Sequence, residues 1–290
     1  MKLVPQHIGW KEFVNRCLAL KEEWLFRGDT IKSCDDPVRS LRTSFDRALE
    51  KWNTFIKNPD RWKIEAELIR DFQRRFDHSN ASRPSNNHTL TWLALMQHHG
   101  APTRLLDWTY SPFVAAFFAF KGLLQTLDSR PNESHALIWA IKRSWFDERL
   151  KNLLDSHELL DIEKVKVNKP RAFAALFGKR RAKKLFVYPV MPFELSQRLI
   201  IQQGVFLCPT NITKTFSENF NAMLRGCKNK DDEEISIFKL SQDDLISALT
   251  DLYRMNVYDA SLFPGMDGYA RSFKTRLPII DRIIKDRGRC

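Results

Sequence analysis

The side chains best suited to chemistry lie together in residues 97–112, which read Gln-His-His-Gly-Ala-Pro-Thr-Arg-Leu-Leu-Asp-Trp-Thr-Tyr-Ser-Pro. Neutral histidines donate hydrogen bonds near working pH, and arginine is suited to bidentate recognition of phosphate. A segment that combines these groups is a good place for a site. We take as candidate catalytic residues His98, His99 and Asp107, together with Gln203 further along the chain. The candidate binding residues of the segment are Arg104, Thr109 and Ser111.

A helix over residues 112–122 is expected to hold this segment in place. The run is apolar on every side, which is typical of a helix buried all round. Ser111 can serve as its N-cap, and Pro112 fits the first helical position. Gly100 and Pro102 bend the chain upstream, so residues 103–109 should form a short extended segment. If buried, Arg104 and Asp107 need partners, and we expect them to pair with each other or with something equally charged.

Two further segments bring polar groups to the ends of strands. Arg27 follows three apolar residues and stands with Gly28 at the end of a short strand, and two roles are open for it. It either bridges to a carboxylate such as Asp29 or Asp107, or it binds a ligand. Gln202 and Gln203 precede the glycine of a later strand, where their amides can donate and accept beside a ligand.

The pattern of apolar residues predicts a single α+β domain with a mixed sheet, packed by the apolar helix and surrounded by further helices. An amino-terminal helical part covers about residues 1–98, and a central core covers about residues 99–290. Residues 261–268 read as turn-rich, followed by a basic tail. The predicted strands are 24–27, 136–141, 185–190, 204–208 and 235–240. The other predicted helices are 9–20, 38–57, 61–77, 89–98, 144–154, 215–225 and 242–254.

The composition favours an acidic partner. The 290 residues contain 47 Lys and Arg against 35 Asp and Glu, a formal net charge of +12, which fits nucleic acid or a phosphorylated ligand. The densest basic run is Lys179, Arg180, Arg181, Lys183 and Lys184, read either as a solvated face or as a nucleic-acid-binding patch. No apolar run reaches the length of a membrane span, and the first residues do not resemble a signal peptide, so we expect a cytoplasmic protein without membrane association. The oligomeric state stays open.

Several motifs resemble the FRG domain family, which is named for the tripeptide at residues 26–28. The family is widespread in bacteria and their phages, which implies a role in conflict between them. The resemblance extends over most of the chain. The motifs that carry it are Phe26-Arg27-Gly28, residues 97–109 with Ser111, Pro112 and Ala115, then Arg198 with residues 202–206, and finally residues 262–268.

The order of these elements also resembles ADP-ribosyltransferases, whose pattern is an arginine, a Ser-Thr-Ser segment and a glutamate. The resemblance implies that Arg27 binds the pyrophosphate of NAD and that Thr109 and Ser111 shape the nicotinamide pocket. Gln202 or Gln203 stands at the third position, where a glutamine cannot supply the negative charge of a glutamate. The nearest carboxylates along the chain that could replace it are Glu194 and Glu218.

Three interpretations therefore stand side by side. The first is an NAD-using transferase or glycohydrolase of ADP-ribosyltransferase-like fold, with NAD as substrate and no metal. The second is a basic module that binds nucleic acid or protein without catalysis. The third makes the histidines, Arg104 and Asp107 a buried polar network that only fixes the fold. A metal hydrolase is disfavoured because adjacent histidines on an extended segment point to opposite sides. A serine hydrolase is disfavoured by the absence of G-x-S-x-G.

Overall fold

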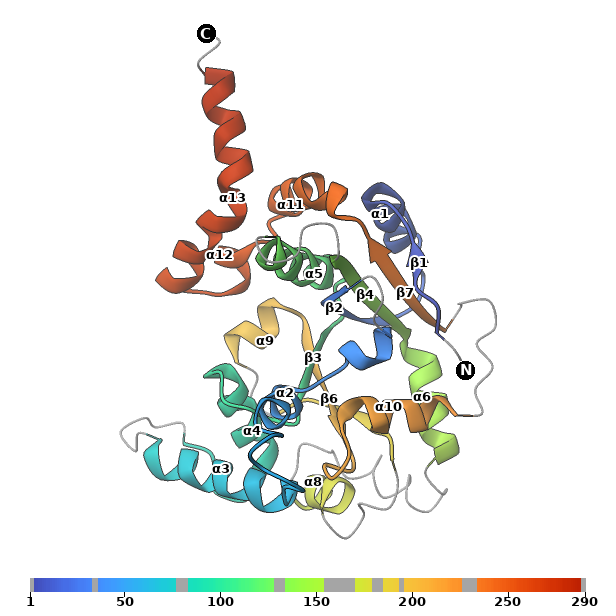
Figure 1. Ribbon diagram of the computed structural model, residues 1–290, viewed down its shortest axis with the longest axis vertical. Coiled ribbons are helices and arrows are strands. Elements are labelled where there is room, and N and C mark those ends of the chain that lie inside the picture. The colour runs from blue at the N-terminus through green and yellow to red at the C-terminus, as the bar shows by residue number, and fades with distance from the viewer. Residues whose placement is uncertain are drawn as a thin grey trace.

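The predicted fold class is confirmed by a computed structural model, which describes residues 3–32, 36–76, 83–127, 134–153, 170–178, 185–192, 196–225 and 234–287. Seven strands form one mixed sheet in the order β1-β7-β4-β2-β3-β6-β5 (Figure 1). Strand β1 runs parallel to β7, and the other neighbours are antiparallel. The strands are β1 Gln6–His7, β2 Trp24–Lys32, β3 Leu106–Thr109, β4 Ser134–Lys142, β5 Val187–Val190, β6 Gly204–Pro209 and β7 Ile235–Leu240.

All five predicted strands are present, and two more complete the sheet. The prediction for β2 was too short, because the strand continues past Gly28 and pairs with β4 along its full length, from Trp24 opposite Lys142 to Lys32 opposite Ser134. Strand β3 lies in the segment that was expected to be extended. Its Leu106 and Trp108 point into the core while Asp107 between them is exposed, as the alternation of a strand requires.

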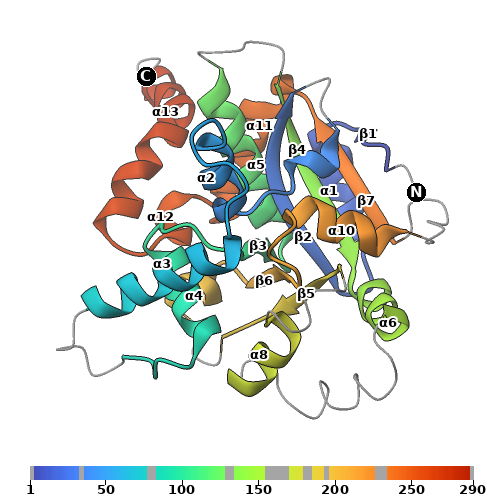
Figure 2. The same ribbon diagram turned by 60° about the horizontal axis from the view of Figure 1, so that its bottom comes forward.

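Helices cover both faces of the sheet, each over its own apolar core. In Figure 2, α5 and α10 lie on opposite sides of β2 and β4. The core on the α5 side includes side chains of α1 (Trp10–Leu18), α5 (Pro112–Thr126) and α11 (Leu245–Arg254). The core on the α10 side includes side chains of α4 (Thr89–His98), α6 (Arg143–Leu153), α8 (Pro170–Phe177) and α10 (Phe216–Leu224). The expected packing of the apolar helix on the sheet is thus confirmed.

The helix expected over residues 38–57 is wrong in its extent. The chain forms a 3₁₀ turn η1 (Pro37–Ser40) and a short α2 (Ser44–Lys51), followed by α3 (Arg61–Arg75). The capping box between Thr43 and Asp46 starts α2 afresh, because the Thr43 hydroxyl accepts the backbone N–H of Asp46 and the Asp46 carboxylate accepts that of Thr43. The short η3 (Gln242–Asp244) likewise precedes α11.

The carboxyl-terminal segment is more helical than expected. Residues predicted to be turn-rich or a basic tail form α12 (Asp259–Leu262) and α13 (Met266–Arg287), a helix that projects from the body of the protein (Figure 1). The predicted turn is limited to the residues between the two helices, where Gly265 has a φ of 106°. The helix α9 (Gln197–Ile201) leads into β6. In the part of the chain that the structure describes, none of the helices combines the length and apolarity needed to cross a bilayer.

Candidate functional site

A gap in the sheet between β2 and β3 forms the candidate site. The two strands are paired at one position, Phe26 opposite Thr109, whereas β3 pairs with β6 along all four of its residues. Past Phe26 the strands diverge and leave a cleft of about 300 Å³. Its apolar wall comes from the sheet and from α5 and includes Phe26, Trp108, Val114 and Phe118. The polar side chains that line the cleft belong to Arg27, Asp29, Thr30, Asp107, Thr109, Arg198 and Gln202.

Arg27 bridges this gap. Its Nη1 donates to the backbone carbonyl of Asp107 at 2.8 Å, and its Nη2 forms an ion pair with the Asp29 carboxylate at 3.3 Å. The side chain is 13% exposed. The predicted bridge to Asp29 is therefore present, while the contact with Asp107 involves its main chain and not its carboxylate. The guanidinium of Arg27 also lines the cleft, so it can contact a ligand there while it bridges the two strands.

Gly28 brings α5 against β2 at the cleft. A Cβ atom at this position would lie 1.8 Å from the carbonyl oxygen of Ala115, so any larger residue would push the helix away from the strand. The predicted start of α5 is confirmed, since Ser111 Oγ accepts the backbone N–H of Val114 and Pro112 occupies the first turn. Gly28 and the cap together fix the first turns of α5 beside the cleft.

A set of hydrogen bonds orients the polar groups contributed by β3. The Asp107 carboxylate accepts a hydrogen bond from Gln97 Nε2 at 2.8 Å, and Gln97 is itself held by the Thr103 hydroxyl. Thr109 Oγ1 donates to the carbonyl of Gln202 at 2.6 Å. The buried Gln202 side chain donates through Nε2 to the carbonyl of Leu262. The walls of the cleft therefore come from three segments that are distant in the sequence but fixed to one another, namely β2, β3 with α5, and residues 198–202.

Arg198 is the site residue that the sequence prediction omitted. It lies on α9, lines the cleft, and stacks over the Phe263 ring with its guanidinium carbon 4.6 Å from the centroid. Burial lowers the pKa of Arg198, which the nearby Asp107 opposes and Arg271 reinforces. The signal in the sequence was its spacing. Arg198 stands four residues before Gln202, so a helical turn places both on one face.

Five of the predicted site residues in the described part of the chain lie outside the lining of the cleft, namely His98, His99, Arg104, Ser111 and Gln203. His98 and His99 are exposed at the end of α4, where the His99 ring packs near Phe72. Partial burial lowers the pKa of His98, and the charges of His99 and Arg198 lower it further. His98 is not among the residues that line the cleft. Gln203 is exposed with a left-handed φ of 47°, and its carbonyl accepts the backbone N–H of Tyr110. Gln203 is thus part of the turn before β6.

Arg104 was expected to pair either with Asp107 or with another charged group, and the second alternative is confirmed. Arg104 is buried, and its guanidinium forms a bidentate ion pair with Glu65 of α3, with Nε to Oε1 at 2.6 Å and Nη2 to Oε2. It also lies over the Trp62 ring at 4.9 Å. Burial alone would lower the pKa of Arg104, but the Glu65 carboxylate outweighs it and raises the pKa. Arg104 therefore holds α3 against the β3 segment and does not line the cleft.

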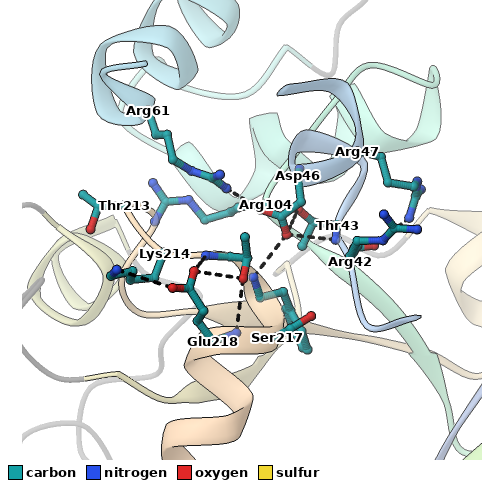
Figure 3. Close-up of polar contacts among 12 residues, drawn as sticks. Arg42, Thr43, Asp46, Arg47, Arg61, Arg104, Thr213, Lys214, Ser217 and Glu218 are labelled. Carbon is teal, nitrogen blue, oxygen red and sulfur yellow. Dashed lines mark hydrogen bonds and ion pairs between the residues drawn. The ribbon is translucent and has the colours of Figure 1, made fainter. Parts of the chain in front are cut away.

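Glu218 is engaged in capping and does not replace the missing glutamate. Its carboxylate accepts the backbone N–H and hydroxyl of Thr215 at the start of α10 and pairs with Lys214 (Figure 3). The neighbouring Asp46 joins three helices, because it caps α2, pairs with Arg61 of α3 and accepts the backbone N–H of Phe216. Glu194 and the basic run of Lys179, Arg180, Arg181, Lys183 and Lys184 lie outside the described residues.

Comparison with known proteins identifies one family. The model of the FRG domain matches residues 22–126, which include β2, β3 and all of α5. The later motifs around Arg198 and at residues 262–268 lie outside the matched range. No curated protein and no solved structure matches the chain.

Proposed function

We propose that this protein, whose residues 22–126 form an FRG domain, binds NAD in the cleft between β2 and β3 and cleaves its nicotinamide–ribose bond. One observation carries the proposal. Arg27 of β2, Thr109 of β3 and Gln202 at the end of α9, which the resemblance to ADP-ribosyltransferases places around one nucleotide, line one cleft. The fold itself brings these three residues to one cleft.

The cleft offers a suitable group for each part of NAD. Arg27 and Arg198 are cations with planar donors, which suit the two phosphates. Val114 and Phe118 form an apolar wall against which a nicotinamide or adenine ring can pack. The backbone of β2 and β3 past their single shared pair supplies further hydrogen-bonding groups for the amide and the riboses.

Cleavage requires that the bond between C1′ of the ribose and the pyridinium nitrogen breaks. The electron pair goes to the nitrogen, which leaves as neutral nicotinamide, and positive charge develops at C1′. An oxygen of water or of an acceptor then bonds to C1′ and loses its proton to solvent. A fixed negative charge near C1′ lowers the barrier, because it stabilises the charge that develops there.

Asp107 is the candidate for that negative charge. Gln202 and Gln203 at the third motif position carry none, and Glu218 is occupied in the cap of α10. Asp29 also lines the cleft, but it is paired with Arg27. Asp107 keeps its carboxylate on a neutral partner, the amide of Gln97. The carboxylate is thereby oriented without its charge being neutralised.

The test measures NAD binding by titration calorimetry and nicotinamide release by chromatography. The variants are Arg27→Ala and Asp107→Asn, with Arg75→Gln as a matched control, because Arg75 is 79% exposed and pairs only with Asp71 among the contacts described for it. We expect Arg27→Ala to weaken binding about ten- to a hundredfold, the range for a hydrogen bond to a charged group. Asp107→Asn should retain binding and slow release about a hundredfold.

The outcomes separate the interpretations. A wild-type protein that does not bind NAD overturns the proposal. Binding without nicotinamide release, with water alone and with added DNA or RNA as acceptor, leaves a nucleotide-binding module without catalysis. Equal losses in Arg27→Ala and Arg75→Gln would show that the effect is one of overall charge and not of the cleft.

A further inference from the structure

A second cavity adjoins the cleft on the far side of Asp29 and Thr30, which line both. Its volume is also about 300 Å³. Apart from Ile31 of β2, the remaining walls come from Asp36, η1, α2 and the turn between the two helices, and they carry three arginines, Arg39, Arg42 and Arg47. We call this cavity the arginine pocket.

The carboxylates that line the arginine pocket already have partners. Glu50 accepts a hydrogen bond from Arg42 Nη1 at 2.5 Å. Asp36 caps η1 by accepting the backbone N–H of Val38 at 3.0 Å. Asp29 pairs with Arg27 in the cleft. None of these contacts involves Arg39 or Arg47.

Two arginines of the pocket therefore lack an anionic partner among the described residues. Arg47 donates to the backbone carbonyl of Arg42 at 2.6 Å, and the structure gives the Arg39 guanidinium no hydrogen bond or ion pair within the described chain. Figure 3 shows the side chains of Arg42 and Arg47 close together, turned away from Asp46. The buried Nε of Arg42 is also without an acceptor among the residues described.

Three arginines share this cavity, and the Arg39 and Arg47 residues remain exposed to solvent. Partial burial lowers the pKa of Arg47, and the charges of Arg27 and Arg42 lower it further, against the opposing effect of Asp29 and Asp107. Like charges that are held together and partly withdrawn from water destabilise a fold. An anion bound between them would remove that cost, and the planar donors of arginine match the oxygens of a phosphate.

We propose that the arginine pocket binds a phosphate group of a second ligand, adjacent to whatever occupies the cleft. Phosphate binding here does not depend on NAD. Where the cleft holds NAD, the second ligand is the acceptor of the transferred group, and this identification rests on the proposed function. The shared Asp29 and Thr30 place the two ligands next to each other.

The test titrates the full chain with pyrophosphate at fixed ionic strength. The variants are Arg39→Gln and Arg47→Gln, with Arg75→Gln as the control for loss of one exposed positive charge. We expect each pocket variant to weaken pyrophosphate binding about tenfold or more and the control to leave it within about twofold. Arg39→Gln should leave NAD affinity unchanged, because Arg39 does not line the cleft.

The Arg27→Ala variant separates the two sites. Pyrophosphate binding that survives Arg27→Ala and is lost in Arg39→Gln supports the arginine pocket, even if the protein binds no NAD. Binding that is lost in Arg27→Ala and retained in Arg39→Gln belongs to the cleft and overturns the proposal. Equal weakening in Arg39→Gln and Arg75→Gln also overturns it, as does a wild-type protein that binds no pyrophosphate.

A second titration identifies the source of the phosphate. A single-stranded hexanucleotide and a nucleoside monophosphate are compared on wild type and Arg39→Gln. Tighter binding of the hexanucleotide, lost in Arg39→Gln, indicates a nucleic-acid acceptor. Equal or tighter binding of the monophosphate, also lost in the variant, indicates a small phosphorylated molecule. A variant that binds both as wild type does contradicts the pocket assignment.

Discussion

Arg104 and Arg27 differ in how completely the fold pairs the hydrogen-bond donors of their guanidinium groups. Arg104 has 3% of its side chain exposed, makes two charged hydrogen bonds to one carboxylate and stacks on Trp62. Arg27 has 13% exposed, contacts a backbone carbonyl and makes one long ion pair, and its Nε has no acceptor among the described residues. Of these two arginines, Arg27 lines the cleft and Arg104 does not.

The difference separates a structural arginine from a binding one. A buried charge is tolerated when its hydrogen-bond donors are paired. The guanidinium of Arg104 donates to the Glu65 carboxylate and to the carbonyl of Phe177. A guanidinium with donors left over beside a cleft can still gain from a ligand. The role of an arginine in this fold therefore depends on how many of its guanidinium N–H groups are left without an acceptor.

The largest expected effect is the loss of the Arg104–Glu65 pair. Arg104→Ala should lower the free energy of unfolding by about 3–5 kcal/mol, because it leaves the Glu65 carboxylate buried without a partner. Chemical denaturation followed by circular dichroism measures this. If the free energy of unfolding falls by less than about 1 kcal/mol, water reaches the Arg104–Glu65 pair, and Arg104 does not differ from Arg27 as a structural residue.

The next effect concerns the contact between β2 and α5. Gly28→Ala should destabilise the protein by about 1–3 kcal/mol, the usual range for forcing an extra methyl into a packed site. The added Cβ meets a backbone carbonyl that cannot turn aside. Thermal unfolding measures the stability, and NAD titration should show a parallel loss because the wall of the cleft moves. Gly9→Ala is a control, since its Cβ would meet no atom within 4 Å.

Much of the fold was readable from local pattern, while the site depended on distant contacts. The apolar runs that became β4, β6 and β7 and the capped start of α5 are local signals, and the structure confirms them. The gap between β2 and β3 is a property of strand pairing and has no local signal. The partner of Arg104 stands 39 residues away on an amphipathic helix, where Glu65 looks like any solvated carboxylate.

Arg27→Ala should affect stability less than either change above. The lost contacts are one hydrogen bond to a carbonyl and one long ion pair, so we expect about 1 kcal/mol or less in the free energy of unfolding. NAD affinity should nevertheless fall more than tenfold in the same protein. If Arg27→Ala instead unfolds the chain as Arg104→Ala does, Arg27 is structural and the distinction between the two arginines is lost.

The smallest effect belongs to a carboxylate that is well bonded but exposed, Glu218. Partial burial acts to raise its pKa, but hydrogen bonds from Thr215 and the charge of Lys214 outweigh this, and the pKa lies below its ordinary value of 4.5. The folded state thus binds fewer protons than the unfolded state in this range. The ionised cap therefore stabilises the protein above about pH 4.5, and this contribution is lost as the pH falls through the lowered pKa.

Glu218→Gln tests this with little change of shape. At pH 7 the variant should be less stable than wild type by under about 1 kcal/mol, because half of the Glu218 side chain is exposed and water screens the charge. The difference should vanish in denaturation curves recorded well below pH 4.5. NAD affinity should not change. A loss as large as that of Arg104→Ala would show that the number of hydrogen bonds, and not burial, sets the cost of removing a charged partner in this fold.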